Sequence, residues 1–317
     1  MRTRPVRVDE MDLFVEAGPP DHREEVEKYL ESMFAAGSMR PEWCFVAQGE
    51  ECVLGRAAFW TLPGTEKPLA LVLFDVPWEG NHLGVGTRLL GDVLGEARAL
   101  GAGEIEHVID TPSMQPQFQH RPERRIRLLG NAGFVLRRET NRFQWPGGEP
   151  PAVPGRLSFR TLEEVGEEAF VDAMRRASEG TLDREIREER ESLGPQGAAR
   201  DFFEDARRVK HEPSWWRLAY DRQGADLTGL VMPAEPPGFL TVFYVGVVPE
   251  MRGRGYVDDL LAAGTLSLLG ARAEGGTEKP LRADTDVANA SMAAAFGRAG
   301  WRRFAGRREY VVDLSPV

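Results

Sequence analysis

Cysteine is scarce in this sequence: only Cys44 and Cys52 occur among 317 residues. Two cysteines cannot supply the disulfide framework of a small secreted domain, so we expect both to be reduced and to serve packing. Long apolar runs are also missing, because the longest candidate, residues 239–248, is too short to cross a bilayer and is broken by Thr241 and Gly246. No apolar stretch follows the basic N-terminus, so no secretory signal is predicted. These absences indicate a cytoplasmic protein that does not enter a membrane.

Positive charge is in deficit, with 40 Lys and Arg against 50 Asp and Glu and a net charge of −10. A nucleic acid would be repelled over long range, so we expect no nucleic-acid partner. The 5 histidines show neither metal-ligand spacing nor a pairing with a cysteine or serine motif, and no metal is predicted. With 42% hydrophobic and 28% charged residues, the chain has the composition of a globular protein, and its length allows two ordinary domains.

The sequence divides almost in half at a stretch rich in proline and glycine, "WPGGEPPAVPG", from Trp145 to Gly155. Such a stretch sustains neither a helix nor a central strand, so residues 146–155 are predicted to link a domain at 1–145 to a domain at 156–317. Landmarks of different kinds recur in the two halves at nearly one spacing, 172 residues for Trp43 and Trp215 and for Pro77 and Pro249, 171 for Gly84 and Gly255, and 167 for Gly133 and Gly300. We interpret the halves as a tandem duplication.

Each half has the same predicted order of elements. A short strand and a charged helix are followed by two or three strands, and an apolar strand then enters a glycine-containing loop and a long helix, near 83–100 and 255–269. A strand, a helix and a closing strand end each half. The alternation of strands and helices predicts an α/β fold in which helices flank a mixed central sheet in each domain.

The loop in the second half, within "VGVVPEMRGRGYVDDLL", has the features of an anion site. Its strand cannot continue through Pro249, and Gly253 and Gly255 allow a tight turn with close backbone approach. The following helix presents unpaired N–H groups and a positive dipole end, to which Arg252 and Arg254 add charge. The motif is neither a P-loop nor a dinucleotide fingerprint. The alternative is a tight turn whose two arginines face water.

In this context "VVPEMRGRGYVDDLL" resembles the acetyl-CoA signature of the GNAT acetyltransferase family, a strand ending in Val-x-Pro and then Arg/Gln-x-x-Gly-x-Gly/Ala at the start of a helix. Arg252 takes the Arg/Gln place and Gly255 the first Gly, while Val257 departs from the small residue that the family prefers. Further on, "ADTDVANASMAAAFGRAGW" resembles the family's second motif, with Asn289 and Gly300 at its Asn and Gly. The resemblance covers most of residues 156–313.

The resemblance implies two tandem GNAT-like acyl-CoA N-acyltransferase domains, in an arrangement similar to the mycothiol synthase type. It further implies acetyl-CoA as co-substrate, bound by Val247, Val248, Arg252, Gly253, Arg254, Gly255, Tyr256, Val257 and Asn289. Asn289 has an alternative role as the cap of the next helix. The first half is similar but eroded, with Asn81 near the arginine place and a secondary cofactor-like loop at Gly84, Val85, Gly86 and Thr87.

The family's catalytic acid, a tyrosine of the second motif, is missing: Phe296 takes its place, and Leu129 does so in the first half. Phenylalanine has no proton to give. The open alternatives are another hydroxyl (Tyr310, Tyr256 or Ser291) or ordered water as the acid, and Asp284, Asp286 or Glu250 as the base. We take Tyr310 and Asp286 as the candidate catalytic residues.

The resemblance therefore predicts an acetyltransferase that acts by direct attack of an amine of a small molecule or peptide. An acidic protein is compatible with a cationic acceptor such as an aminoglycoside, a polyamine or an amino-acid derivative. The rival hypothesis is a CoA-binding regulatory or scaffolding protein without turnover, and a third is a dimerisation module without CoA affinity. The chain is expected to be a monomer or a homodimer.

Overall fold

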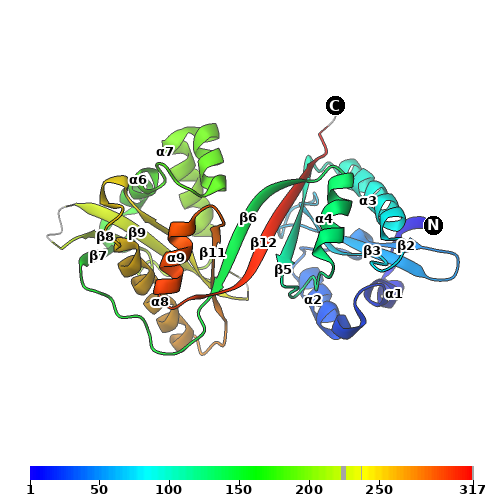
Figure 1. The fold of residues 1–317 in the computed structure, drawn as a ribbon, viewed down its shortest axis with the longest axis horizontal. Coiled ribbons are helices and arrows are strands. Elements are labelled where there is room, and N and C mark those ends of the chain that lie inside the picture. Colours follow the sequence, from blue (N-terminus) through cyan, green and yellow to red (C-terminus); the bar gives the residue numbers. More distant parts are fainter. Residues whose placement is uncertain (223–225, 237, 316–317) are drawn as a thin grey trace. The chain divides into compact units, whose positions relative to one another are not determined.

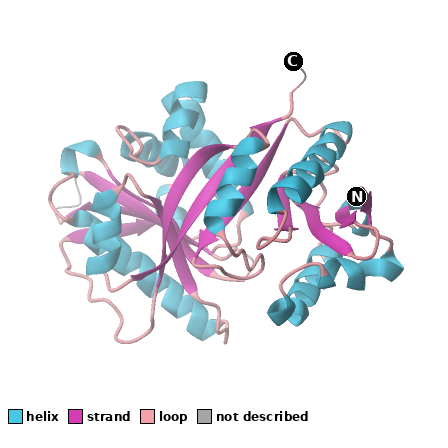
Figure 2. Cartoon of the chain, turned by 45° about the vertical axis from the view of Figure 1, so that its right-hand side comes forward, coloured by secondary structure: helices cyan, strands magenta, loops and turns pink. Residues whose placement is uncertain are grey.

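The computed structural model describes residues 1–222, 226–236 and 238–315. Two compact units account for the chain: the first comprises Met1–Glu139 and Gly306–Val317, and the second comprises Thr140–Ala305. Each unit is an α/β sandwich with a mixed sheet, as predicted (Figures 1 and 2). No helix of the described residues is long and apolar enough to span a membrane.

The sheet of the first unit has helices on both faces. One face carries a core that includes Leu89 of α3 and Leu128 of α4, and the other carries a core that includes Phe14 of α1 and Leu30 of α2. The strands run in the order β1-β2-β3-β4-β5-β12. The elements are β1 (Arg2–Pro5), α1 (Met11–Glu16), α2 (Arg23–Ala35), β2 (Cys44–Gln48), β3 (Val53–Trp60), β4 (Ala70–Asp75), α3 (His82–Ala99), β5 (Glu104–Thr111), α4 (Pro122–Asn131) and the end of β12 (Arg302–Asp313).

The second unit repeats this plan with strand order β6-β11-β10-β9-β8-β7. Leu260 of α8 and Phe296 of α9 pack on one face of its sheet, and Phe170 of α6 and Phe203 of α7 pack on the other. The elements are the end of β6 (Val135–Gln144), β7 (Leu157–Thr161), α5 (Leu162–Val165), α6 (Glu167–Ala177), α7 (Arg184–Arg208), β8 (Arg217–Asp221), β9 (Leu227–Ala234), β10 (Leu240–Val247), α8 (Tyr256–Glu274), β11 (Leu281–Asp286) and α9 (Ala290–Arg298).

The closing strands are exchanged between the two halves of the sequence. Thr140 to Gln144 of β6 pair antiparallel with β11 of the second unit, and Gly306 to Asp313 of β12 pair antiparallel with β5 of the first. The predicted boundaries 1–145 and 156–317 describe the sequence repeat, and the compact units differ from them by this exchange. Residues 146–155 contain no helix or strand, as predicted, but they connect β6 to β7 within the second unit.

In each unit two parallel strands separate soon after they begin. Strand β10 pairs with β11 at Leu240↔Leu281 and Thr241↔Arg282, and β4 pairs with β5 at Ala70↔Glu106. An extra residue interrupts the antiparallel register of β10 between Val242 and Tyr244, and a similar shift interrupts β4 between Val72 and Asp75. A bulge of this kind bends its strand and increases its twist. We call the diverging segments 71–75 and 107–111 the first splay, and 242–247 and 283–286 the second splay.

Tyr310 belongs to the first unit. It lies opposite His107 on β5, it is 6% exposed, and it packs in the same core as Leu89 and Phe134. The candidate catalytic pair is thus divided, because Asp286 lies in the second unit. Sequence reasoning missed this because strand exchange leaves no trace in the local pattern of β12. Tyr310 packs as a core residue of the first unit, and its catalytic role stays a prediction.

Replacing Tyr310 by alanine should remove about 3 kcal/mol of stability, because it leaves a cavity in the core of the first unit. The loss should be local, so hydrogen–deuterium exchange should accelerate in β4 and β5 while β8 and β9 keep their protection. Tyr310→Phe, which keeps the packing, is the matched control. Faster exchange confined to the second unit would contradict the strand exchange.

Candidate functional site

The loop of the second unit has the predicted order of strand, glycine turn and helix. Strand β10 ends at Val247, residues Pro249–Met251 form one 3-10 turn, and α8 begins at Tyr256. Gly253 and Gly255 have φ of 76° and 74°, a left-handed conformation that favours glycine. Gly255 is the N-cap of α8, so the unpaired amides of the helix start next to the turn.

Arg252 holds this loop in place with its own side chain. Its guanidinium donates to the carbonyl oxygens of Val247 at 3.0 Å, Ala177 at 2.9 Å and Glu179 at 2.6 Å. The last two carbonyls lie at the end of α6 and just beyond it, so Arg252 ties the connection from α6 to α7 to the end of β10. Its role in the structure is to position the loop. Arg254 is exposed, and its contacts within the described residues are a 3.3 Å bond to the Glu250 carbonyl and a 3.6 Å contact with the Met251 sulfur. Both guanidinium groups are exposed, and that of Arg254 is held by fewer backbone carbonyls.

Arg156 is a residue of this loop that sequence reasoning missed. It donates to the carbonyl oxygens of Arg254 at 3.1 Å and Gly255 at 2.8 Å, and it forms an ion pair with Asp259, whose side chain is fully buried. The hydrogen bond that Arg156 donates to the Asp259 carboxylate raises the pKa of Arg156. Asp258, also in the first turn of α8, pairs with Arg298 at 2.8 Å. Both carboxylates at the helix start are thereby neutralised, which limits their repulsion of a bound anion.

The remaining predicted loop residues are partly engaged within the unit. The Val248 amide donates to the Thr228 carbonyl at 3.0 Å, and the Val248 carbonyl accepts from Met251 at 3.0 Å. Tyr256 lies under the Arg156 guanidinium, 5.3 Å from it. Tyr256 and Val257 pack against the core with half-buried side chains. No hydrogen bond of the described residues engages the amides of Gly253 to Val257.

The strand end opposite the loop is also connected to the start of α7. Asp286 is buried and accepts from the Arg184 amide at 2.5 Å. The carboxylate therefore fastens the start of α7 to the end of β11. Asn289 accepts from the Met292 amide at 3.2 Å as the N-cap of α9, so its capping alternative is observed. Neither contact alone assigns a catalytic role, and the base function of Asp286 stays a prediction.

The second splay keeps much of its inner edge unengaged. Phe243, Tyr244 and Val245 are half-buried, and no side chain of the described residues hydrogen-bonds the backbone of 243–246 or 283–285. Backbone N–H and C=O groups in such a position need partners from water or from a ligand. An extended ligand that carries amide groups could supply them.

The corresponding loop of the first unit is differently built. The helix α3 starts at His82, so Gly84, Val85, Gly86 and Thr87 lie in its first turns and do not form a loop. The Asn81 side chain accepts from the Gly84 amide at 3.1 Å and takes up one of the free helix-start donors. A Cβ on Gly86 would come within 2.3 Å of the Leu128 side chain, so this glycine allows α3 and α4 to approach closely. The loop geometry predicted for these four residues is therefore wrong, because they are helical and Gly86 serves helix packing.

Comparison with known proteins identifies the fold. The chain is similar over 99% of its length to a GCN5-related N-acetyltransferase from Sphaerobacter thermophilus, of which it covers 96%, with a TM-score of 0.58 at 16% identity. It is similar over 100% of its length to a tandem GNAT protein from the clavulanic acid biosynthesis pathway, of which it covers 99%, with a TM-score of 0.52 at 15% identity. The fold is a tandem GNAT fold. No family model and no curated protein matches the sequence.

Phe296, in the place of the usual tyrosine of the GNAT motif, is a core residue of the second GNAT unit. It is 2% exposed and stacks on Phe143 with ring centroids 5.0 Å apart.

Tyr244 follows the bulge of β10, and its hydroxyl is a candidate group that sequence reasoning missed. Its ring meets Phe202 of α7 edge-on at 5.3 Å, and no hydrogen bond of the described residues engages its hydroxyl. The sequence signal that could have indicated this residue is a tyrosine within a mostly apolar strand.

The surroundings of Tyr244 give it an unusual electrostatic environment. Burial raises the pKa of Tyr244, the charge of Asp183 raises it further, and Arg252 and Arg190 oppose them. The phenol therefore stays protonated and able to donate at neutral pH. A Cβ on Gly246 would lie 3.1 Å from the hydroxyl, so this glycine leaves space for it.

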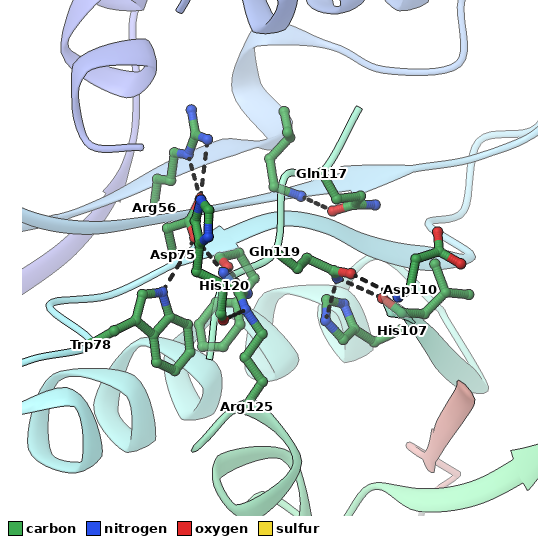
Figure 3. A network of polar contacts seen from close by, with 12 residues as sticks. Arg56, Asp75, Trp78, His107, Asp110, Gln117, Gln119, His120 and Arg125 are labelled. Atoms are coloured by element: carbon green, nitrogen blue, oxygen red, sulfur yellow. Dashed lines mark hydrogen bonds and ion pairs between the residues drawn. The ribbon is translucent and has the colours of Figure 1, made fainter. Parts of the chain in front are cut away.

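The first GNAT unit has a buried polar network at its splay (Figure 3). Asp75, at the end of β4, pairs with the guanidinium groups of Arg56 and Arg125, both with fully buried side chains, and accepts from Trp78 at 3.4 Å. His107 of β5 is bonded to the Leu71 carbonyl at 2.8 Å. Among the described residues, no group of histidine, cysteine and acidic side chains could hold a metal ion.

His107 should make the stability of the first unit depend on pH. Burial lowers its pKa to about 4 from an unfolded value of about 6.5, so the unfolded state binds the proton more tightly. This stability is present above pH 6.5 and is lost as the pH falls toward 4, by about 2 kcal/mol between pH 7 and pH 5. Chemical denaturation at both pH values measures it. His107→Gln should show a smaller loss, and an equal loss would contradict the assignment.

Proposed function

We propose that the protein is an acetyltransferase that transfers an acetyl group from acetyl-CoA to an amine at the second GNAT unit. The observation that carries the proposal is the combination of an unengaged inner edge along β10 and β11 with a left-handed glycine turn at the start of α8. The turn and the helix start suit the pyrophosphate, and the strand edge suits the amides of the pantetheine arm.

The residues of this unit divide into clear roles under the proposal. Arg252 and Arg156 hold the backbone of the turn, the amides of Gly253 to Val257 bind phosphate oxygens, and Arg254 adds positive charge. This pre-organisation lowers the ordering cost of binding because the turn is already held by side chains before the ligand arrives.

In the proposed reaction the amine nitrogen attacks the thioester carbonyl carbon, a C–N bond forms and the C–S bond breaks. The ammonium proton is lost to a base, and the departing thiolate takes a proton from an acid. We propose Tyr244 as that acid, because no hydrogen bond of the described residues engages its hydroxyl and because it lies in the second splay. Asp286 stays the proposed base, and a cationic small amine stays the proposed acceptor.

A second candidate function is CoA binding without turnover, and the burial of Phe296 in the core favours it. Both functions require a CoA site, so binding alone does not separate them. Turnover does, because only the enzyme releases CoA thiol when an amine is present.

Isothermal titration of acetyl-CoA into the protein should give one equivalent. Arg254→Glu places a negative charge at the turn without disturbing the core, and it should weaken binding by about tenfold or more. The matched control is Arg88→Glu, an exposed residue of α3 in the first unit, which should bind like the wild type. No heat would refute the acetyl-CoA site, and two equivalents would refute its restriction to the second unit.

Turnover is then tested by the release of CoA thiol with polyamines, aminoglycosides and amino-acid derivatives. A blank without amine is needed because the exposed thiol of Cys52 also reacts with a thiol reagent.

With an amine that is turned over, Tyr244→Phe should lower kcat by about 100-fold while acetyl-CoA binding is unchanged, because only the proton donor is removed. Tyr220→Phe, a tyrosine on β8, is the matched control and should keep its kcat. An unchanged kcat in Tyr244→Phe would exclude this residue as the acid and leave ordered water in that role.

A further inference from the structure

The inner edge of β4 in the first splay is bonded to the protein's own side chains. The Leu73 amide donates to Gln117 Oε1 at 2.7 Å, the Leu71 carbonyl is bonded to His107 Nδ1 at 2.8 Å, and the Phe74 carbonyl accepts from Arg125. Leu73 has a φ of 49°, so the bulge turns its amide out of the normal ladder. Successive polar groups of the strand edge are thereby occupied.

The inner edge of β5 is engaged in the same way. Gln119 donates through Nε2 to the Val108 carbonyl at 2.6 Å and accepts at Oε1 from the Asp110 amide at 3.1 Å. One side-chain carboxamide thus completes a donor–acceptor pair with the strand, as a neighbouring strand or an amide-bearing ligand would. Gln117 and Gln119 therefore bridge the space that β4 and β5 leave between them (Figure 3).

The segment that carries these glutamines is itself held firmly. Phe118 is 7% exposed and stacks on His22 with ring centroids 3.7 Å apart. Its amide donates to the Met114 carbonyl at 2.8 Å, and the His120 carbonyl accepts from Arg125 at 2.7 Å. The residues of β4 beside it, Leu71 to Asp75, are all buried, unlike the half-buried residues 243–245 of β10.

The two units differ here by chain length. Ten residues (112–121) connect β5 to α4 in the first unit, whereas three (287–289) connect β11 to α9 in the second. The longer connection allows Gln117 and Gln119 to reach the edges of β4 and β5. The repeat spacing changes in the same direction, because it falls from 171 at Gly84 to 167 at Gly133.

From this geometry we infer that residues 112–121 act as a built-in ligand of the first splay, so that the first unit takes no acyl-CoA. The carboxamides of Gln117 and Gln119 and the guanidinium of Arg125 occupy the backbone groups that a bound amide chain would need. Displacing Arg125 would also break its buried ion pair with Asp75, which is costly. The inference concerns the first unit alone and does not depend on catalysis in the second.

Hydrogen–deuterium exchange of the full-length protein, with and without saturating acetyl-CoA, tests the inference. Acetyl-CoA should leave exchange in residues 71–75 and 107–111 unchanged. Protection of either segment would overturn the built-in ligand. Protection of neither splay would refute the proposed function while the inference stands, so the two failures can be told apart.

The variant Gln117→Ala/Gln119→Ala should accelerate exchange of the Leu73 and Asp110 amides by about tenfold, because each loses its acceptor. Gln115→Ala, an exposed glutamine of the same segment, is the matched control and should not change them. Unchanged exchange in the double variant would overturn the inference. If the double variant does not fold, the ligand experiment on the wild type still decides the question.

Discussion

The early separation of two parallel strands is the constraint on which each unit depends. A bulge bends β4 and β10 away from their parallel neighbours after one or two paired residues, and it leaves backbone donors and acceptors facing an open interval. Buried groups of this kind must be satisfied by side chains, water or a ligand. The two units share one fold, but they differ in which of these groups supplies the partners.

In the first unit the protein's own side chains supply these partners, and under our proposal a ligand supplies them in the second unit. A long connection after β5 brings Gln117 and Gln119 back to the strand edges, and Arg125 and Asp75 close the end of the splay with a buried ion pair. The connection after β11 is too short to return, so the edge of β10 stays half-buried. The two units therefore share one fold and differ in the connection that follows β5 or β11.

The charged side chains around the second loop are also engaged mainly with groups of the protein itself. Arg252, which the sequence suggested as a phosphate ligand, donates to three backbone carbonyls. Arg156 forms an ion pair with Asp259 at the start of α8. Both arginines thus hold the backbone of the turn, and under our proposal its amides bind the anion. A pattern of Arg and Gly in sequence predicts that a turn can bind an anion, but it does not say which arginine is free.

The sequence by itself determined the order of strands and helices, the duplication, the glycine turn after β10 and the absence of a tyrosine at Phe296, because these depend on local pattern and spacing. It also indicated both roles of Asn289, of which the structure shows the cap. Only the tertiary structure decided that Tyr310 packs in the first unit, that Gly86 serves helix packing and that Arg156 braces the loop. These outcomes rest on partners far apart in the chain, and a side chain's role is set by which groups the fold brings within hydrogen-bonding and packing distance of it.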